Sequence, residues 1–448
     1  MKINRQLDSS MTPARPDAAM ASDPFGATER FFDAREGMLF VTGRAGTGKS
    51  TLLRRLKEKT GRNCAVVAPT GLAAVNAGGQ TIHSFFKFPP RLIEARDIRK
   101  SANARVMRSL DCLIIDEVSM VRADLMHGID RALRINRERP REPFGGVQVM
   151  LFGDVHQLAP VVQRELHAHF EESFGGIYFF NAPVFRDAGG DMLELTRVFR
   201  QTDAHFVALL NAVREGRPDR DAFEALNARV MPLEAVAQRA KTVILTPTNQ
   251  IAFELNRQAL SELKGSASAF EAQITGQFEE SAYPTDKVLF LKPGAKVVLL
   301  RNDPKGRWVN GTLAEVVLIK GGAVHIAVDD EVHELEPVTW EALRYGVSEG
   351  GSGDEGEGRL KSETVGKFRQ LPIRLAWAMT IHKAQGLTLE SVYLDMGRGS
   401  FAHGQTYVAL SRARSLEGLA LARPLRRADI VFDEAALRYR QLFTALRA

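Results

Sequence analysis

Five short runs of apolar residues recur between residues 38 and 200, and helix-like stretches such as residues 52–60 separate them. The runs read MLFVTG, NCAVVAPT, DCLIIDE, VQVMLFGD and MLEL. Strands that are apolar on both faces are typical of a parallel sheet that helices cover on each side. The pattern therefore predicts a first α/β domain over residues 36–198.

The second half of the chain carries two different patterns. TVILTPTN, and after residue 370 VYLDMG and GLALARPL, again have the composition of buried strands in an α/β domain. Between them, AKVVLLRND, RWVNGTLAEVVLI and AVHIAVDD are short, alternating and joined by Gly-rich turns, which indicates a small antiparallel β-barrel. We expect a second α/β domain formed by residues 199–282 and 371–448, with the barrel at 283–370 inserted into it.

Two segments lack a pattern of buried positions. Residues 1–35 contain no apolar segment typical of a signal peptide, and we expect them to form a flexible tail. GVSEGGSGDEGEG, residues 346–358, is Gly-rich and acidic, which predicts a flexible loop within the inserted barrel.

Composition indicates a folded protein with more than one domain. A chain of 448 residues exceeds one ordinary core, and 44% apolar with 25% charged residues is typical of globular proteins. No apolar run approaches the ~20 residues that cross a bilayer. Cys64 and Cys112, the two cysteines, lie in apolar runs, as buried thiols do in a reducing compartment, so we expect a cytoplasmic protein. A net charge of +6 is compatible with a polyanionic partner.

The run GRAGTGKS, residues 43–50, matches the phosphate-binding pattern G-x-x-x-x-G-K-[ST], and it follows a predicted strand and opens a predicted helix. Its glycines let backbone N–H groups converge on phosphate oxygens at a helix N-terminus, where the helix dipole favours anions. Lys49 is expected to bridge the β- and γ-phosphates, and Ser50 to bind Mg²⁺. The expected nucleotide-binding residues of this segment are Gly43, Gly46, Thr47, Gly48, Lys49, Ser50 and Thr51.

The run CLIIDE ends in two carboxylates, Asp116 and Glu117. An aspartate at the end of a buried strand can orient the Mg²⁺ shell of a bound nucleotide. The adjacent glutamate can act as the general base for an attacking water. Such a pair is common at strand ends, but after a phosphate loop it predicts a nucleoside triphosphatase.

A third polar site follows the run VQVMLFGD, in the stretch GDVHQLAPV. This strand is expected to lie next to the strand that ends at Asp116, which would place Asp154 and Gln157 at the C-terminal edge of the sheet, where open α/β sheets bind ligands. Gln157 could then sense the γ-phosphate or orient the water. The alternative is a polar loop residue that caps the next turn.

Six stretches together are similar to the ordered motifs of superfamily 1 helicases, and most similar to the Pif (petite integration frequency) and RecD-like DNA helicases. They read APTGLAAVNAGGQTIHSFF, IIDEVSM, FGDVHQLAPV, ELTRVFRQ, AWAMTIHKAQGLTLESV and YVALSRARSLEGL, and the similarity spans about residues 36 to 425. The resemblance implies two RecA-like P-loop domains around ATP and Mg²⁺. It implies an ATP-dependent 5′-to-3′ translocase and helicase that acts on single-stranded DNA and on DNA with a 5′ single-stranded tail.

The resemblance also assigns residues of the second domain. Arg200 in VFRQ and Arg412 in ALSRAR match the arginine fingers, which stabilise charge on the transferring phosphoryl group, with Arg197 as an alternative to Arg200. Gly386 is expected beside the nucleotide. The family pattern often has an adenine-reading glutamine upstream of the phosphate loop; this chain has none in DPFGATERFFDAREGM, and Gln6 is remote, so selectivity for ATP over GTP stays open.

Nucleic-acid contacts are likewise implied by the resemblance. Hydroxyl, imidazole and ammonium groups can hold backbone phosphates, and aromatic faces can stack on unpaired bases. The expected contact residues are Pro69, Thr70, His83, Phe85, Thr380, His382, Lys383 and Trp308. For Phe85 and Trp308, packing in a hydrophobic core is the alternative. Residues 87–109 occupy the place of the family's strand-separating wedge.

Two other functions remain open from the sequence. An RNA-directed helicase would use similar backbone contacts, and a nucleotide-gated clamp or remodeller would bind DNA without unwinding it. We expect the protein to be a monomer of bacterial type that is associated with the nucleoid. We expect it to have no membrane partner and no small-molecule substrate other than the nucleotide.

Overall fold

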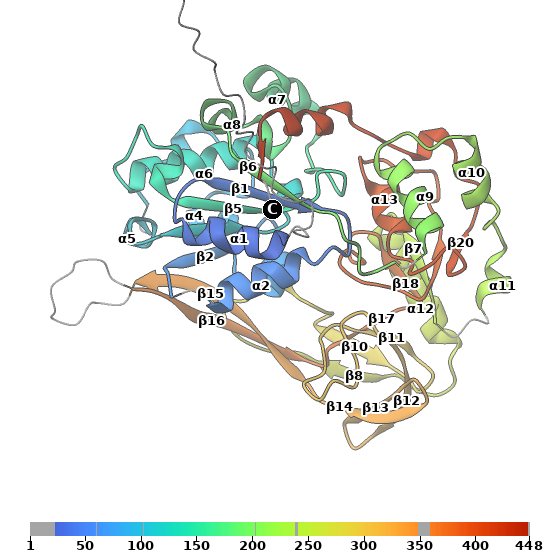
Figure 1. Cartoon of the computed structure of the whole chain (residues 1–448). Helices are drawn as coiled ribbons and strands as arrows, with labels where there is room; N and C mark the ends of the chain where they lie inside the picture. The colour runs from blue at the N-terminus through green and yellow to red at the C-terminus, as the bar shows by residue number, and fades with distance from the viewer. Residues whose placement is uncertain are drawn as a thin grey trace, which may run out of the picture.

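In a computed structural model of the chain, the structure describes residues 23–59, 61–101, 103–201, 203–237, 241–347 and 359–446. Two α/β units lie side by side, and a group of antiparallel strands lies below them in the view of Figure 1. The predicted α/β fold, with two RecA-like halves, is therefore confirmed. Among the described residues, no helix is long and apolar enough to cross a membrane.

The first domain is built on a parallel sheet with the strand order β21-β6-β1-β5-β4-β2-β3. Its strands are β1 (Met38–Gly43), β2 (Cys64–Ala68), β3 (Gln80–Thr81), β4 (Cys112–Ile115), β5 (Gln148–Gly153), β6 (Asp191–Leu195) and β21 (Thr444–Ala445). Its helices are α1 (Pro24–Asp33), α2 (Lys49–Lys59), α3 (Gly71–Ala77), α4 (Ile82–Phe86), α5 (Ala104–Arg108), α6 (Ala123–Asn136), α7 (His167–Phe174) and α8 (Pro183–Ala188). As expected, β5 is a direct neighbour of β4, which brings the two polar strand ends together.

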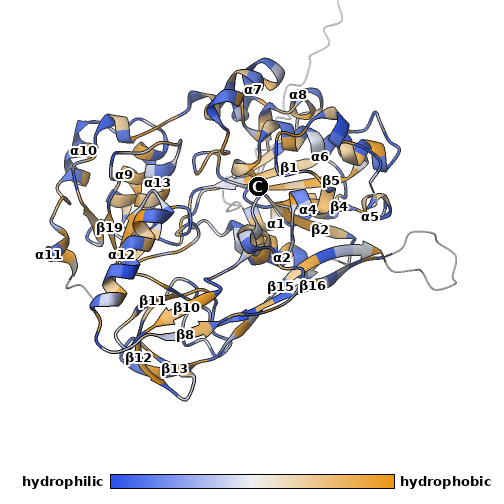
Figure 2. Cartoon of the chain, turned by 180° about the vertical axis from the view of Figure 1, so that it is seen from behind, coloured by the Kyte–Doolittle hydropathy of each residue, from blue (hydrophilic) through white to orange (hydrophobic). Residues whose placement is uncertain are grey.

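Alternate residues of these strands enter two separate cores, one on each face of the sheet. Phe40 of β1 packs on one face with α4, α5 and α6, while Leu39 packs on the other with α2. Figure 2 shows the same arrangement as hydrophobic strands β1, β2 and β5 between more polar helices. Burial on both faces explains the unbroken apolar runs of the sequence.

The second domain has a smaller parallel sheet with the strand order β18-β7-β19-β20. Its strands are β7 (Thr242–Thr246), β18 (Ala378–Thr380), β19 (Ser391–Leu394) and β20 (Leu419–Leu421). Its helices are α9 (Ala204–Arg214), α10 (Arg220–Asn227), α11 (Leu233–Ala237), α12 (Asn249–Glu262) and α13 (Gln405–Leu410).

The inserted strands occupy a longer stretch than residues 283–370, because they begin at Ser268 and end at Leu375. Strands β14-β13-β12-β11-β17 form one sheet and β10-β8 a second, and the two share one core. These strands are β8 (Ser268–Glu271), β10 (Val288–Leu291), β11 (Lys296–Leu299), β12 (Leu313–Lys320), β13 (Ala323–Val328), β14 (Glu331–Leu335) and β17 (Ile373–Leu375). β8 is only four residues long and none of them is fully buried, so its sequence is too short and too weakly apolar to be recognised as a strand of the insert.

A long hairpin leaves this insert and reaches the first domain (Figure 1). It consists of β15 (Val338–Val347) and β16 (Leu360–Gln370), with β9 (Gln273–Gly276) at its base. The Tyr345 hydroxyl accepts a hydrogen bond from the backbone N–H of Val66 at 2.9 Å, so the hairpin contacts the edge of β2. Of the predicted flexible loop 346–358, the first two residues belong to β15, and 348–358 lie outside the described residues.

The N-terminal segment differs from the prediction of a tail over residues 1–35. Residues 23–35 are described, and most of them form α1, which Asp23 caps by accepting a hydrogen bond from Gly26 N at 3.0 Å. Phe32 is buried against the outer face of the sheet, which supplies the packing that a short helix needs. Gln6 and the rest of residues 1–22 lie outside the described part.

The C-terminal segment also differs from the predicted domain boundary, because it returns from the second domain to the first. Glu434–Gln441 form a 3-10 helix, and β21 then pairs in parallel with β6. Tyr439 is fully buried in the first-domain core, with its ring 5.8 Å from that of Phe40. A two-residue strand has no periodicity, so the sequence carried no signal for this return.

Candidate functional site

The phosphate loop connects β1 to α2 at the C-terminal edge of the first sheet. Gly46 and Gly48 have φ values of 78° and 93°, a left-handed backbone that favours glycine. The Lys49 ammonium donates to the carbonyl oxygens of Gly43 at 2.6 Å and Arg44 at 3.0 Å, so it lies within the curve of the loop. Burial lowers the pKa of Lys49, and the carboxylates of Asp154 and Glu117 oppose that shift.

Thr47, Ser50 and Thr51 complete the predicted loop residues. The Thr47 hydroxyl is buried and donates to the Arg44 carbonyl at 2.9 Å, so it holds the loop in shape. Ser50 and Thr51 lie exposed in the first turn of α2, where a hydroxyl is open to a ligand.

Arg200, in the segment between β6 and α9, lies against this loop. A Cβ atom on Gly46 would come within 2.5 Å of the Arg200 Cβ, so the close approach requires glycine. The Arg200 guanidinium donates to the Gly386 carbonyl at 2.8 Å, while its Nη1 is buried with no hydrogen-bond partner among the described residues. Burial lowers the pKa of Arg200 to about 10. A cation with an unpaired donor beside a phosphate loop fits a bound anion.

The alternative residue, Arg197, lies farther out. It is exposed, and its guanidinium stacks 4.9 Å from the ring centre of Phe199. The structure therefore brings Arg200, and not Arg197, to the loop.

Asp116 and Glu117 follow β4 directly opposite the loop. Glu117 has a left-handed backbone with φ 49°, an uncommon conformation for a residue with a side chain, and its N–H donates to the Asp116 carboxylate at 2.9 Å. Burial, with the negative charge of Asp116 next, raises the pKa of Glu117 to about 7. Such a carboxylate is well matched to accept a proton near neutral pH.

Gln157 lies at the same edge and is buried. Its amide nitrogen donates to Asp154 at 3.2 Å, and its oxygen accepts from the Gln385 side chain at 3.4 Å. Gln385 also donates to Glu117 at 3.1 Å. These contacts link the end of β5, the base candidate and a loop of the second domain, so Gln157 does more than cap a turn.

Arg412 is buried in the second domain at the C-terminal end of α13. Its guanidinium donates to the carbonyl oxygens of Val408 and Leu387 and to the Ser411 hydroxyl, at 2.9, 3.3 and 2.8 Å. Burial, with the nearby charge of Arg200 next, lowers its pKa, and Glu117 opposes that shift. Arg412 thus lies close enough to Arg200 and to Glu117 for their charges to act on it, while its hydrogen bonds stay within its own domain.

The expected nucleic-acid residues fall into two places. Pro69, Thr70 and His83 lie half-buried after β2 and on α4. Thr380, His382 and Lys383 follow β18; Thr380 accepts a hydrogen bond from Lys383 N at 3.2 Å, and the Lys383 side chain is exposed. Burial lowers the pKa of His83 and of His382, so both imidazoles favour the neutral form.

Phe85 and Trp308 are not open to a strand in this structure, which corrects their assignment as base-stacking residues. Phe85 is fully buried, with its ring 5.7 Å from that of Tyr345. Trp308 lies in the core of the insert, with the Arg307 guanidinium 4.4 Å from its ring centre. Both rings therefore pack in hydrophobic cores, where large apolar side chains are most often found.

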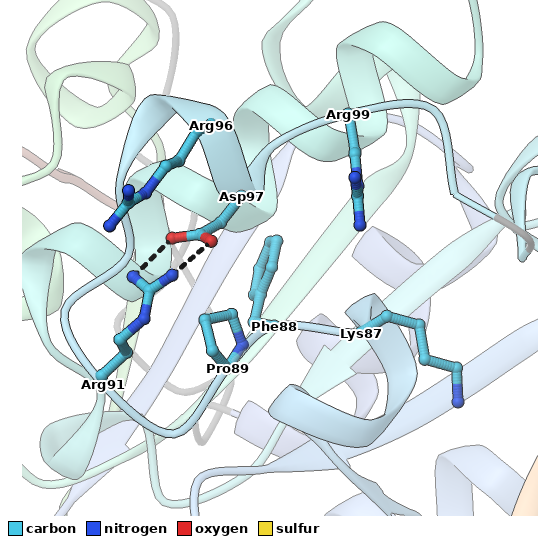
Figure 3. Close-up of a pocket in the computed structure, with 7 residues that line it drawn as sticks. All are labelled: Lys87, Phe88, Pro89, Arg91, Arg96, Asp97 and Arg99. Carbon is cyan, nitrogen blue, oxygen red and sulfur yellow. Dashed lines mark hydrogen bonds and ion pairs between the residues drawn. The ribbon is translucent and has the colours of Figure 1, made fainter.

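The segment expected to form a wedge, residues 87–109, contains a basic cavity of about 700 Å³. It is lined by Lys87, Phe88, Pro89, Arg91, Arg96, Asp97 and Arg99. Arg91 and Asp97 form a bidentate ion pair. In Figure 3, Phe88 lies between this pair and the side chains of Lys87 and Arg99. The cavity keeps positive charge outside that pair, as a surface for an anionic backbone does.

Three residues of the site were not predicted from the sequence. Gln385 lies inside a stretch that already resembled a helicase motif, so its position was a usable signal. Tyr407 accepts a hydrogen bond from the phosphate-loop N–H of Ala45 at 3.3 Å, and Arg214 pairs with Asp154 at 3.0 Å. These two contacts join residues far apart in the chain, and no local pattern announces them.

The chain is similar to known helicases over most of its length. The family model described as PIF1-like helicase matches residues 26–222. The ATP-dependent DNA helicase PIF1 of Rattus norvegicus is 36% identical over 392 residues, which are 85% of this chain, and the chain spans 58% of that protein's length. The ATP-dependent DNA helicase Pif1 of Bdellovibrio bacteriovorus is 31% identical over 422 residues, with 91% of this chain and 89% of that protein covered.

Solved structures give the same likeness. The complex of Bacteroides sp Pif1 with ADP-AlF4 matches with a TM-score of 0.85 and 33% identity, over 94% of this chain and 96% of that chain. Bacteroides Pif1 in complex with ADP-AlF3 and ssDNA matches with a TM-score of 0.66 and 34% identity, over 94% and 97% of the two chains.

Proposed function

Because this chain belongs to the PIF1-like helicase family, we propose that it is an ATP-dependent DNA helicase that moves 5′ to 3′ along single-stranded DNA. The direction rests on the resemblance of its motifs to that family. The complex of the Bacteroides relative with single-stranded DNA supports this choice of substrate.

One observation carries the proposal: Gln385 joins the two domains at the base candidate. Its amide donates to Glu117 at 3.1 Å and to Gln157 at 3.4 Å. Gln385 stands only two residues after Lys383, in the loop expected to hold the strand. A change at the nucleotide can therefore reach the strand-holding loop through a single side chain.

The residues present fit ATP with Mg²⁺. Two buried groups meet the phosphate loop as an anion site requires: the Lys49 ammonium and the unpaired Arg200 donor. Ser50 and Asp116 would hold Mg²⁺, since hydroxyl and carboxylate oxygens are its usual ligands. When bound, the ion would neutralise charge on the phosphates.

Within this site Glu117 would accept the proton of the attacking water, and Gln157 would orient that water. Arg200 and Arg412 would stabilise charge on the transferring group, Arg412 after exchange of its hydrogen bonds to Val408 and Leu387. Gly386, bonded through its carbonyl to Arg200, would follow any movement of that guanidinium.

On the strand side, Pro69, Thr70 and His83 of the first domain and Thr380, His382 and Lys383 of the second would contact the backbone. If the two sets contacted the strand alternately, a closing movement of the two domains would become a step along the strand. The basic cavity of residues 87–99 would meet the duplex ahead of the strand, as the wedge.

Steady-state ATP hydrolysis tests the proposal, measured alone and with single-stranded DNA, single-stranded RNA or blunt duplex. We expect strong stimulation by single-stranded DNA, and unwinding of a duplex with a 5′ tail but not with a 3′ tail. Equal stimulation by RNA would favour an RNA-directed helicase. Strong stimulation by DNA without separation of any tailed duplex would favour a nucleotide-gated clamp, and hydrolysis indifferent to nucleic acid would reject a translocase.

A further inference from the structure

A buried ion pair joins the two domains behind the phosphate loop. Arg214 ends α9 of the second domain, and Asp154 follows β5 of the first. The Arg214 Nη2 donates to the Asp154 Oδ1 at 3.0 Å, and the two side chains are only 3% and 0% exposed. Charges buried this deeply need each other, because an unpaired one is strongly destabilising.

The same carboxylate holds Gln157. The Asp154 Oδ2 accepts from the Gln157 side chain at 3.2 Å, and its Oδ1 also accepts from the backbone N–H of His156 at 3.2 Å. Asp154 therefore connects Arg214 to the residue proposed to orient the attacking water.

Other contacts hold this segment against the second domain. Leu158 follows β5 of the first domain in the sequence, but its side chain packs in the hydrophobic core of the second domain. A Cβ atom on Gly404 would lie 2.2 Å from the Gln157 carbonyl oxygen, and the His403 ring is 3.1 Å from the carbonyl oxygen of Val155. Residues 154–158 thus rest on surfaces that belong to the other domain.

Arg214 also decides the charge of Asp154. Burial alone would raise the pKa of this carboxyl, but the charges of Arg214 and Lys49 bring it to about 2. His156 also lies close to Asp154, but burial and the charge of Arg214 lower its pKa to about 4. Its imidazole is therefore neutral near pH 7 and cannot replace the positive charge of the arginine.

We propose that Arg214 is a positioning residue for ATP hydrolysis, which fixes the Asp154 carboxylate and, through it, the side chain of Gln157. The inference rests on the proposed ATPase function. It adds that the second domain holds the Gln157 side chain in place through Asp154. A movement of α9, which carries Arg214, would therefore move the group proposed to orient the water.

A double-mutant cycle tests the pair. The variants are Arg214→Gln, Asp154→Asn and the two combined, with Arg214→Lys as the conservative variant. Arg220→Met is the matched control, because the Arg220 side chain on α10 is 89% exposed and its ion pair with the exposed Glu224 lies on the surface. For each, kcat and KM for ATP, affinity for a fluorescent non-hydrolysable ATP analogue, and hydrogen exchange of amides 154–158 without nucleotide are measured.

We expect Arg214→Gln to lower kcat at least about tenfold, since a hydrogen bond to a charged group is lost. Affinity for the analogue should stay within about threefold, because Lys49 and the phosphate loop are untouched. Amides 154–158 should exchange faster than in the control, and Arg214→Lys should recover part of kcat. The double variant should be no worse than Asp154→Asn alone, because Arg214 then has no carboxylate to position.

The inference is overturned if Arg214→Gln keeps kcat and exchange at the level of the control, or if its loss adds in full to that of Asp154→Asn. If Arg214→Gln does not fold, Arg214→Lys decides, since it keeps a positive charge beside Asp154. A lower kcat with faster exchange at amides 154–158 than in the control would then support the inference, and both at the level of the control would overturn it. Should the wild type fail to hydrolyse ATP, the proposed function fails, while exchange at residues 154–158 still tests the position of the segment.

Discussion

Gln385 of the second domain donates a hydrogen bond to the Glu117 carboxylate of the first, at 3.1 Å. Glu117 is held in a left-handed backbone at the end of β4, so its carboxylate has a fixed place beside the phosphate loop. The bond places the base candidate in direct contact with the loop that carries Thr380, His382 and Lys383.

We expect Gln385→Met to weaken the coupling between strand binding and hydrolysis. A hydrogen bond to a charged group contributes about 1.5–3 kcal/mol, so stimulation by single-stranded DNA should fall about 10- to 100-fold. KM for ATP should change little, because the hydrogen bonds of the Gln385 side chain within the described part of the chain go to Glu117 and Gln157 and not to the phosphate loop. Gln258→Met is the control, since the Gln258 side chain donates to Glu262 on the surface of α12 and, among the described residues, forms no other hydrogen bond. Unchanged stimulation in Gln385→Met would remove this side chain from the coupling path.

The pH dependence of hydrolysis should report on Glu117. Burial raises the pKa of this carboxyl to about 7, so it is ionised above that pH and neutral below it. A base must be ionised to accept a proton, and kcat/KM should therefore fall as the pH drops through about 7. Glu117→Gln should lower turnover at least about 100-fold while nucleotide still binds. A profile that is flat across this range in the wild type would contradict the assignment.

Gly46 should resist substitution because of Arg200. Gly46→Ala would place a methyl group 2.5 Å from the Arg200 Cβ, in a backbone with φ 78° that costs an L-residue about 1–2 kcal/mol. We expect affinity for an ATP analogue to fall at least about tenfold, since the loop or the arginine must move. In Gly61→Ala the new methyl meets nothing within 4 Å, so that variant should bind like the wild type. Equal affinity in both variants would show that the loop tolerates the shift.

The sequence predicted those parts of the molecule that depend on local pattern. Strands β1, β4 and β5 of the first sheet are rich in apolar residues because they are buried along their whole length. The phosphate loop and the Asp116–Glu117 pair directly follow two of these strands. The family resemblance placed Arg200 in the site, and the structure brings it to Gly46.

Contacts between distant segments could not be read in this way. Arg214 and Tyr407 reach the first domain from helices whose sequence gives no sign of a partner. Phe85 has the same letters whether its ring packs on Tyr345 or stacks on a base, and only the docked hairpin decides between them. Short elements that depend on tertiary packing, such as α1 and the two-residue β21, were missed for the same reason.

The return of the C-terminus to the first domain leads to the last prediction, on stability. The Tyr439 ring is fully buried among Phe40, Phe180 and His156, while its hydroxyl has no hydrogen-bond partner among the described residues. Removal of the ring in Tyr439→Ala should cost about 3–5 kcal/mol and release β21 from the edge of the sheet. Removal of the hydroxyl alone in Tyr439→Phe should leave stability unchanged or raise it by about 1 kcal/mol, because a buried unpaired hydroxyl is unfavourable. Thermal and denaturant unfolding of the two variants beside the wild type measure this difference; a loss in Tyr439→Phe as large as that in Tyr439→Ala would show that the hydroxyl, and not the packing of the ring, holds the C-terminal segment in place.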